Sequence, residues 1–186
     1  NSVIVDVIPV GNGASGIPML KEWNYNRFKK LEDQLDTEYG YIFANYNNVL
    51  EYGYGYAANP KALRVALSDN INNAGTEPAT KTHSPIIGFA YDGNPIYGPF
   101  GYSEALNKDS SIARMPSSYS LSGSRSDGPS ITTYPLGTFN NDYTYTHKSG
   151  TLDQNNGRFC VTPEFPQGTY AYFITIDSNQ VPQYPY

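Results

Sequence analysis

The chain has 186 residues, a formal net charge of −5 and only 16% charged residues, while aromatic residues make up 15% of it. The acidic balance argues against nucleic acid as a partner, because binding to a phosphate backbone needs a basic face. The single cysteine excludes an intramolecular disulfide and a zinc site made of cysteines. No apolar run approaches the roughly 18 residues of a membrane helix, so we expect no membrane span.

The length of the chain suits one well-buried domain. We expect a single domain over residues 1–186, with a core at 39–177, an N-terminal strand and short helix within 1–38, and an extended tail at 178–186. Low charge with abundant Tyr, Asn and Gly is typical of extracellular or particle-borne modules, which bind through neutral hydrogen bonds and stacking. Because the chain begins with Asn rather than Met, we expect a processed form or a piece of a larger protein.

The first predicted elements are a strand, a helix and a hairpin. Residues 3–10 are β-branched and precede a Gly-rich turn, which predicts a strand. Within 20–38, Leu31 and Leu35 are four residues apart among mixed charges, which predicts a short helix. Two aromatic runs within 39–60 flank the polar sequence NYNN, which predicts a hairpin.

Three tyrosines of this hairpin alternate along one strand. Tyr52, Tyr54 and Tyr56 should share one face, because side chains of a strand alternate between its two sides. We expect this stripe to pack in the core, as is usual for an aromatic run of period two. The alternative is an exposed stripe that binds carbohydrate.

Residues 59–72 predict a second short helix. Asn59 could cap its N-terminus, and Pro60 suits its first turn. The apolar residues on one side of this helix should be buried, namely Leu63, Ala66 and Leu67.

The second half of the chain reads as strands and loops. Asp92 and Gly93 lie between two apolar runs and predict the tight turn of a hairpin, since Gly accepts positive φ. The Ser-rich stretch 107–135 contains three prolines and predicts a long surface excursion. The alternating stretches 143–150 and 168–177 predict strands. We therefore expect a mainly β fold, an antiparallel sandwich or irregular barrel with long loops and one or two short helices.

Acidic residues in Gly- and aromatic-rich surroundings offer two kinds of site. Asp153 and Asn155 place hard oxygens at alternate positions of a tight loop, and Glu164 could join them to bind Ca²⁺ if the chain folds back. The alternative is an Asx turn that satisfies its own backbone. A glycosidase-like hydrolase would need Asp92, Asp153 and Glu164 brought together by the fold. Beyond this Ca²⁺ candidate we expect no cofactor.

The two histidines and the cysteine have simple structural interpretations. His83 stands before a predicted strand, where we expect it to hydrogen-bond a turn, and His147 should be solvated in a loop. Cys160 is flanked by Phe159 and Val161, which predicts a small buried side chain rather than the nucleophile of a Cys–His pair.

Two long ordered stretches carry a family resemblance. The sequences HSPIIGFAYDGNPIYGPFGY at 83–102 and LDQNNGRFCVTPEFPQGTYAYFIT at 152–175 resemble the YHYH domain family, over about residues 83–176. That family occurs in bacterial extracellular proteins and in structural proteins of tailed bacteriophages, notably cyanophages. The chain shares with the family's motifs the residues His83, Asp92, Gly93, Arg158, Tyr170 and Tyr172.

The signature that names the family falls on residues 170–173, so Ala171 and Phe173 stand where the resemblance implies histidines. No metal or proton-transfer role that depends on those histidines is therefore expected. We expect the alternating strand to pack the polar loop against the hairpin at Asp92, with Arg158 pairing with Glu164 or Asp153.

The resemblance and the composition together imply a non-enzymatic structural or interaction module of a virion, such as a tail, baseplate or fibre-associated protein. We expect assembly with copies of itself or with other virion proteins, and the tail at 178–186 could dock on a neighbour or be a flexible end. The first alternative is a secreted bacterial carbohydrate-binding or fibre domain, with or without Ca²⁺. The second is a degenerate hydrolase-like enzyme.

Overall fold

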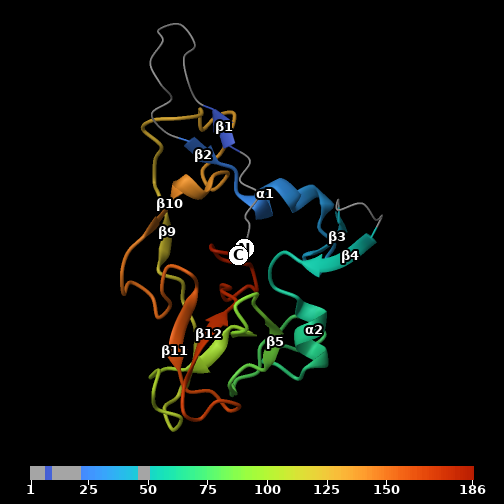
Figure 1. Ribbon diagram of the computed structural model, residues 1–186, viewed down its shortest axis with the longest axis vertical. Coiled ribbons are helices and arrows are strands. Elements are labelled where there is room, and N and C mark those ends of the chain that lie inside the picture. Colours follow the sequence, from blue (N-terminus) through green and yellow to red (C-terminus); the bar gives the residue numbers. More distant parts are fainter. Residues whose placement is uncertain (1–6, 10–21, 46–50) are drawn as a thin grey trace, which may run out of the picture.

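The computed structural model describes residues 7–9, 22–45 and 51–186 (Figure 1). Short strands dominate and form five small sheets, accompanied by two short α-helices, which confirms the predicted mainly β class. The described strands do not close into a barrel. None of the helices in these ranges has the length and apolar character needed to cross a membrane.

The N-terminal elements follow the predicted order of strand, helix, hairpin and helix. They are β1 (Val7–Pro9), β2 (Glu22–Asn24), α1 (Arg27–Leu31), the 3-10 turn η1 (Glu32–Gln34), β3 (Gly40–Asn45), β4 (Glu51–Tyr56) and α2 (Lys61–Ala66). The first predicted helix starts late because the side chain of Asn26 caps it, accepting from the backbone N–H of Phe28 and of Lys29. Most of the predicted strand 3–10, the Gly-rich turn after it and the NYNN turn lie outside the described residues.

The C-terminal elements are almost all strands. They are β5 (Ile86–Phe89), β6 (Pro95–Tyr97), β7 (Phe100–Tyr102), β8 (Ile112–Arg114), β9 (Tyr119–Leu121), the 3-10 turn η2 (Asn140–Asp142), β10 (Tyr143–Tyr145), β11 (Gly157–Cys160) and β12 (Thr169–Phe173). The stretch 107–135 is mostly exposed, as a surface excursion should be, but it also contains two short strands. These strands are β8, which pairs with β7, and β9, which pairs with β10. They form through this pairing although their own sequences have no strand pattern.

The second predicted helix forms, but its buried side differs from the prediction. Asn59 does not cap α2, because its side-chain oxygen instead accepts from Arg64 Nη1 at 2.8 Å. Arg64 is fully buried, whereas Ala66 and Leu67 are exposed. The apolar pattern predicted the wrong buried side of α2, because Arg64 forms a buried ion pair with Asp69.

The four-stranded sheet lies in the lower half of the molecule in Figure 1 and has the order β11-β12-β6-β5. β12 pairs parallel with β6, and the other two pairings are antiparallel. The β5–β6 hairpin confirms the predicted turn: Gly93 has φ 82°, and Asp92 Oδ1 accepts from the backbone N–H of Asn94 at 3.0 Å. The main core packs beneath this sheet and contains Tyr97, Met115, Leu152, Cys160, Ala171 and Phe173.

Two buried arginine–aspartate pairs brace the irregular parts of the chain. In the lower half, Arg64 contacts Asp69 at 2.6 Å, with both side chains fully buried. In the upper half, Arg125 contacts Asp142 at 2.6 Å and lies 4.9 Å from the ring centre of Phe139. Removing one member of such a pair leaves an uncompensated buried charge, so these pairs fix loops that have little regular structure.

The tail 178–186 packs on its own chain in the middle of the molecule (Figure 1). Tyr184 stacks on Tyr143 with ring centres 4.0 Å apart, and Tyr186 stacks on Phe28 at 4.3 Å. The tail therefore joins the helical N-terminal part to the strands of the second half. Docking of the tail on a neighbouring molecule stays a prediction.

Candidate functional site

The four-stranded sheet has two chemically different faces. Along β12, Ala171 and Phe173 point inward and are 0% and 2% exposed, whereas Tyr170 and Tyr172 point to the opposite side and are partly exposed. This alternation follows from the pleat of a strand. The strand register places four side chains together on the outer face: Phe159, Tyr170, Tyr172 and Ile96.

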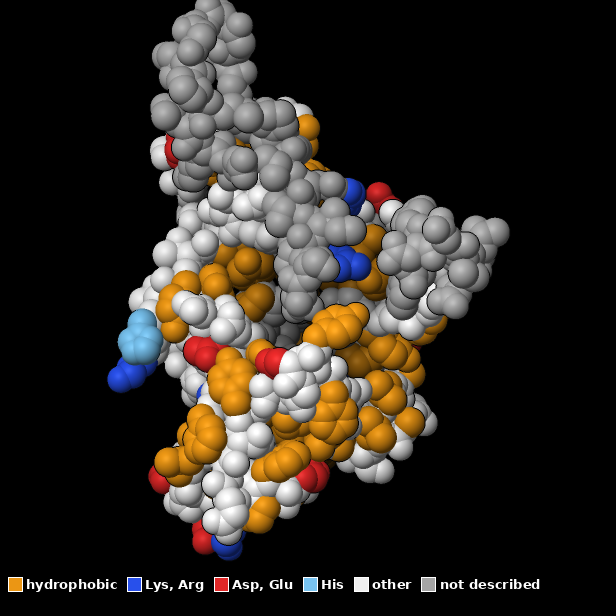
Figure 2. All heavy atoms as spheres, viewed as in Figure 1, with side chains coloured by type: hydrophobic (Ala, Val, Ile, Leu, Met, Phe, Trp, Pro, Cys, Tyr) orange, Lys and Arg blue, Asp and Glu red, His pale blue; other side chains and the backbone are white. Residues whose placement is uncertain are grey.

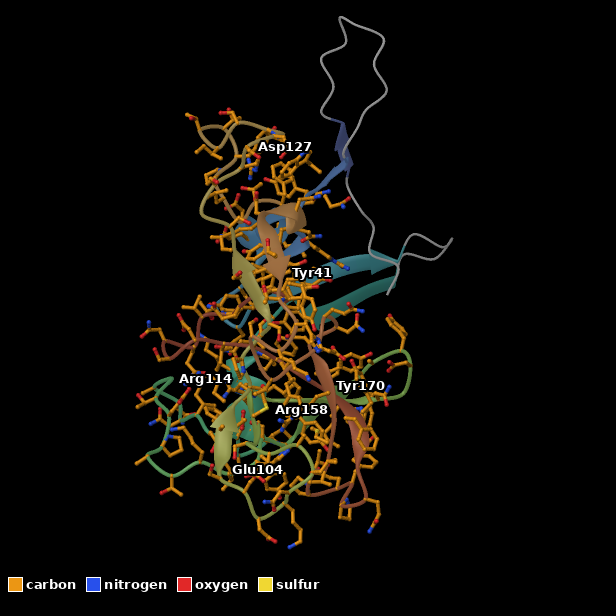
Figure 3. All side chains as sticks on the ribbon, turned by 90° about the vertical axis from the view of Figure 1, so that its left-hand side faces the viewer. Tyr41, Glu104, Arg114, Asp127, Arg158 and Tyr170 are labelled. Carbon is orange, nitrogen blue, oxygen red and sulfur yellow. The ribbon has the colours of Figure 1, made fainter. Side chains whose placement is uncertain are left out.

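Two tyrosine–aspartate pairs hold the outer face in place. The hydroxyl of Tyr172 donates to Asp92 Oδ2 at 2.6 Å, and the hydroxyl of Tyr170 donates to Asp153 Oδ2 at 2.7 Å. The two rings meet edge to face with centres 5.1 Å apart. Figure 3 shows Tyr170 towards the edge of the lower half, with Arg158 further inside.

Each aspartate also closes the turn in which it stands. Asp153 Oδ1 accepts from the backbone N–H of Asn155 at 2.8 Å and of Gly157 at 3.1 Å. The Asx turn considered for this loop is therefore present. Asp92 does the same in the β5–β6 hairpin, so both carboxylates link a rigid turn to a tyrosine ring.

The hydrogen bonds shift the ionisation of both partners in opposite directions. The phenol of Tyr172 lowers the pKa of Asp92, and the Asp92 carboxylate raises the pKa of Tyr172 to about 12. Burial and Asp153 together raise the pKa of Tyr170. At neutral pH the Asp92 carboxylate is therefore a charged acceptor, and the phenols of Tyr170 and Tyr172 remain donors.

Glycines let the outer-face rings lie against the sheet. A Cβ at Gly157 would stand 2.4 Å from the Tyr170 hydroxyl, and a Cβ at Gly168 would stand 2.8 Å from the Phe159 ring. Phe159 is still 58% exposed. The outer face is thus an aromatic surface that is partly open to solvent.

A third tyrosine–aspartate pair stands on the β3–β4 hairpin. Tyr54 donates to Asp36 at 2.5 Å and contacts the ring of Tyr56 edge to face. These two tyrosines are 54% and 42% exposed, so the prediction that this stripe packs in the core is wrong for them. A two-stranded hairpin needs another layer to bury either of its faces, and the described chain leaves these two rings largely open to solvent. The side chain of Tyr52 lies outside the described residues.

A groove opens beside the outer face, where the β5–β6 hairpin meets the loop before β11 and the tail. Its volume is about 640 Å³. We call it the hairpin groove; among the residues that line it are Phe89, Tyr91, Asp92, Tyr172, Gln154 and Asn155. Tyr91 is 96% exposed and Phe89 is 63% exposed. Apolar side chains gather over this part of the molecule (Figure 2).

The predicted Ca²⁺ ligands are not brought together. Glu164 accepts from the hydroxyl of Tyr97 at 2.8 Å, on the inner side of the sheet, whereas Asp153 bonds Tyr170 on the outer side. Among the described residues, no three His, Cys, Asp or Glu side chains gather as a metal site would require. Ca²⁺ binding by Asp153 and Asn155 alone stays a prediction.

His83 and Arg158 both belong to the inner side. His83 contacts the ring of Tyr97 at 5.1 Å and hydrogen-bonds the carbonyl of Ser84 at 2.8 Å, and burial lowers its pKa. Arg158 is 9% exposed, lies over Phe173 and donates to the carbonyl of Tyr102. Its predicted pairing with Glu164 or Asp153 is wrong, because it faces the core instead.

The remaining predictions for the thiol and the second histidine are confirmed. Cys160 is fully buried, and burial raises the pKa of its thiol. His147 is exposed in the turn after β10. Neither forms part of the outer face or of the hairpin groove.

The family model described as YHYH protein matches residues 2–184, which is nearly the whole chain. The chain belongs to the YHYH family. No curated protein and no solved structure matches it. The family match extends well beyond the two motif stretches at 83–102 and 152–175, so the N-terminal half is part of the same unit of sequence similarity.

Proposed function

We propose that this YHYH-family chain is a non-catalytic structural and interaction module of a virion, associated with a tail, baseplate or fibre. In this role it assembles with copies of itself or with other virion proteins and needs no metal or cofactor. The observation that carries the proposal is the outer face together with the hairpin groove, where aromatic side chains stand open to solvent. Large exposed aromatic surfaces mark sites of interaction.

The use of the acids supports a binding role rather than a catalytic one. Asp92 and Asp153 each accept from a tyrosine hydroxyl and from a backbone N–H, so both are committed to holding the surface. Glu164 serves the inner side of the sheet. A hydrolase would need two carboxyl groups free to contact one substrate.

The virion context rests on the resemblance to tailed-phage structural proteins and on composition. Only 16% of residues are charged, and Tyr alone contributes 18 residues. Tyrosine supplies rigid contact area at low entropic cost, which suits a surface that binds. The same features favour a secreted carbohydrate-binding or fibre domain as the second candidate.

The proposal is tested by locating the protein. Virions from the culture that carries this gene are purified by density gradient, washed with high salt and analysed by quantitative mass spectrometry. We expect the chain to follow the tail proteins in a constant ratio across the gradient. Its recovery only from particle-free fractions would contradict the virion role, and recovery from the medium would favour the secreted candidate.

A further inference from the structure

The hairpin groove has three walls of different chemistry. The β5–β6 hairpin contributes Phe89, Tyr91 and Asp92, and the loop before β11 contributes Gln154 and Asn155. The third wall comes from the tail, through Pro182, Pro185 and Tyr186. A volume of about 640 Å³ is within the range of small-ligand sites, about 300 to 1,000 Å³.

The aromatic wall is exposed and stands on a hydrogen-bonded turn. The turn that carries Tyr91 is closed by hydrogen bonds from Ala90 N–H to the Asn94 carbonyl and from Gly93 N–H to the Ala90 carbonyl, both 2.9 Å long. Tyr172 fastens the same turn to β12 through Asp92. The backbone that carries Tyr91 is therefore fixed before any ligand arrives, which reduces the backbone entropy lost on binding, while the 96% exposed ring is free to adjust to a ligand.

The polar wall consists of neutral amides and one carboxylate. Gln154 and Asn155 are exposed, and Asp92 uses one carboxylate oxygen for Tyr172 and the other for a backbone N–H. Each of these oxygens can still accept a second hydrogen bond, because a carboxylate offers about four acceptor sites. The groove can therefore receive several hydroxyl groups.

The charge of the groove restricts what it can bind. Among the described lining residues there is no Lys, Arg or His, and Asp92 is the only charged one. An anionic ligand such as a phosphate or an acidic sugar would have no counter-charge and would meet a carboxylate. A neutral ligand with both an apolar face and many hydroxyls fits the lining, and sugar rings have this chemistry.

We propose that the hairpin groove is a binding site for a neutral carbohydrate. Tyr91 and Phe89 stack on the C–H faces of sugar rings, while Asp92, Asn155 and Gln154 hydrogen-bond the hydroxyls. This proposal rests on the proposed function, since it names a ligand for the same interaction surface.

The test uses the whole chain and isothermal titration calorimetry with maltohexaose, cellohexaose, mannohexaose, xylohexaose and chitohexaose, and with oligogalacturonate as the anionic probe. At least one neutral oligosaccharide should bind and oligogalacturonate should not. Tyr91→Ala should weaken that binding about tenfold, the loss of one stacked ring. Phe159→Ala is the matched control, because Phe159 is 58% exposed on the same sheet but does not line the groove; it should bind like the wild type.

Three results would overturn the proposal: no binding by any neutral member of the panel, binding that Tyr91→Ala leaves unchanged, or binding of oligogalacturonate alone. Tyr91 is almost fully exposed, so its replacement should leave the fold and the thermal unfolding midpoint intact. Particle association measured on the same variant separates the two proposals. A chain that enters particles but ignores every sugar would refute the carbohydrate site while keeping the structural role.

Discussion

Two tyrosines on opposite faces of one sheet make the same interaction in different surroundings. Tyr97 on β6 donates to Glu164 at 2.8 Å on the inner side and is fully buried, while Tyr172 on β12 donates to Asp92 at 2.6 Å on the outer side. The hydroxyl of Tyr97 also bonds the buried Thr162, so its hydrogen bonds contribute more to stability than the exposed outer bond. The outer bond instead fixes an exposed ring and the turn beside it, and this difference separates scaffold from site.

The largest expected difference between the faces comes from removing whole rings. Phe173→Ala should lower the free energy of unfolding by about 3–5 kcal/mol, because it opens a cavity in a closely packed core. Tyr172→Ala should cost clearly less, since that ring is partly solvated already. Urea unfolding followed by tyrosine fluorescence measures both. Equal losses would show that the outer face is as much a part of the core as the inner face.

Removing only the hydroxyl groups tests the two hydrogen bonds. Tyr97→Phe should cost about 1–3 kcal/mol, the range for leaving a buried polar group without its partner, because the buried Thr162 bonds this hydroxyl. Tyr172→Phe should cost no more than about 1 kcal/mol. The same urea titrations decide the order, and a larger loss for Tyr172→Phe would reverse the assignment of scaffold and site.

The two faces should also respond to acid in separate pH windows. Burial lowers the pKa of His83 below its ordinary 6.5, so the unfolded chain binds the proton more readily and stability falls as pH drops below about 6.5. The bond from Tyr172 lowers the pKa of Asp92, so its contribution is present above pH 3.8 and is lost as pH falls through the lower folded-state pKa.

Replacing His83 or Asp92 shows in which pH range each side chain affects stability. His83→Gln should flatten the stability profile just below about pH 6.5, whereas Asp92→Asn should flatten it only below about pH 4. Thermal unfolding midpoints across pH give both profiles. An Asp92→Asn profile that changes near pH 6 would mean that the two faces are electrically coupled, contrary to their separation across the sheet.

Local patterns in the sequence were enough to predict the hairpin at Asp92 and Gly93, the alternating strand that became β12, and the burial of Cys160. Each depends on residues close together in the chain. Turn chemistry and strand alternation act over a few residues, so they can be read without knowing the fold.

The pairings that define the site depend on contacts far apart in the chain. Tyr172 and Asp92 are 80 residues apart, and the burial of Arg64 depends on how its helix meets Asp69 and Gln180. No local pattern distinguishes an aspartate that holds a tyrosine from one that only closes its turn. The exposure of Tyr91 likewise depends on the fold, because Tyr91 stands in the turn between β5 and β6 and no described segment packs over its ring.

The role of the outer face as a contact surface is tested most directly by hydroxyl-radical footprinting with mass spectrometry, on the free chain and on the chain in purified particles. Phe159 should be labelled strongly in the free chain and protected in the particle, while Tyr97 and Phe173 stay unlabelled in both. Labelling of Phe159 that is equally strong in the particle would contradict a contact role for this surface.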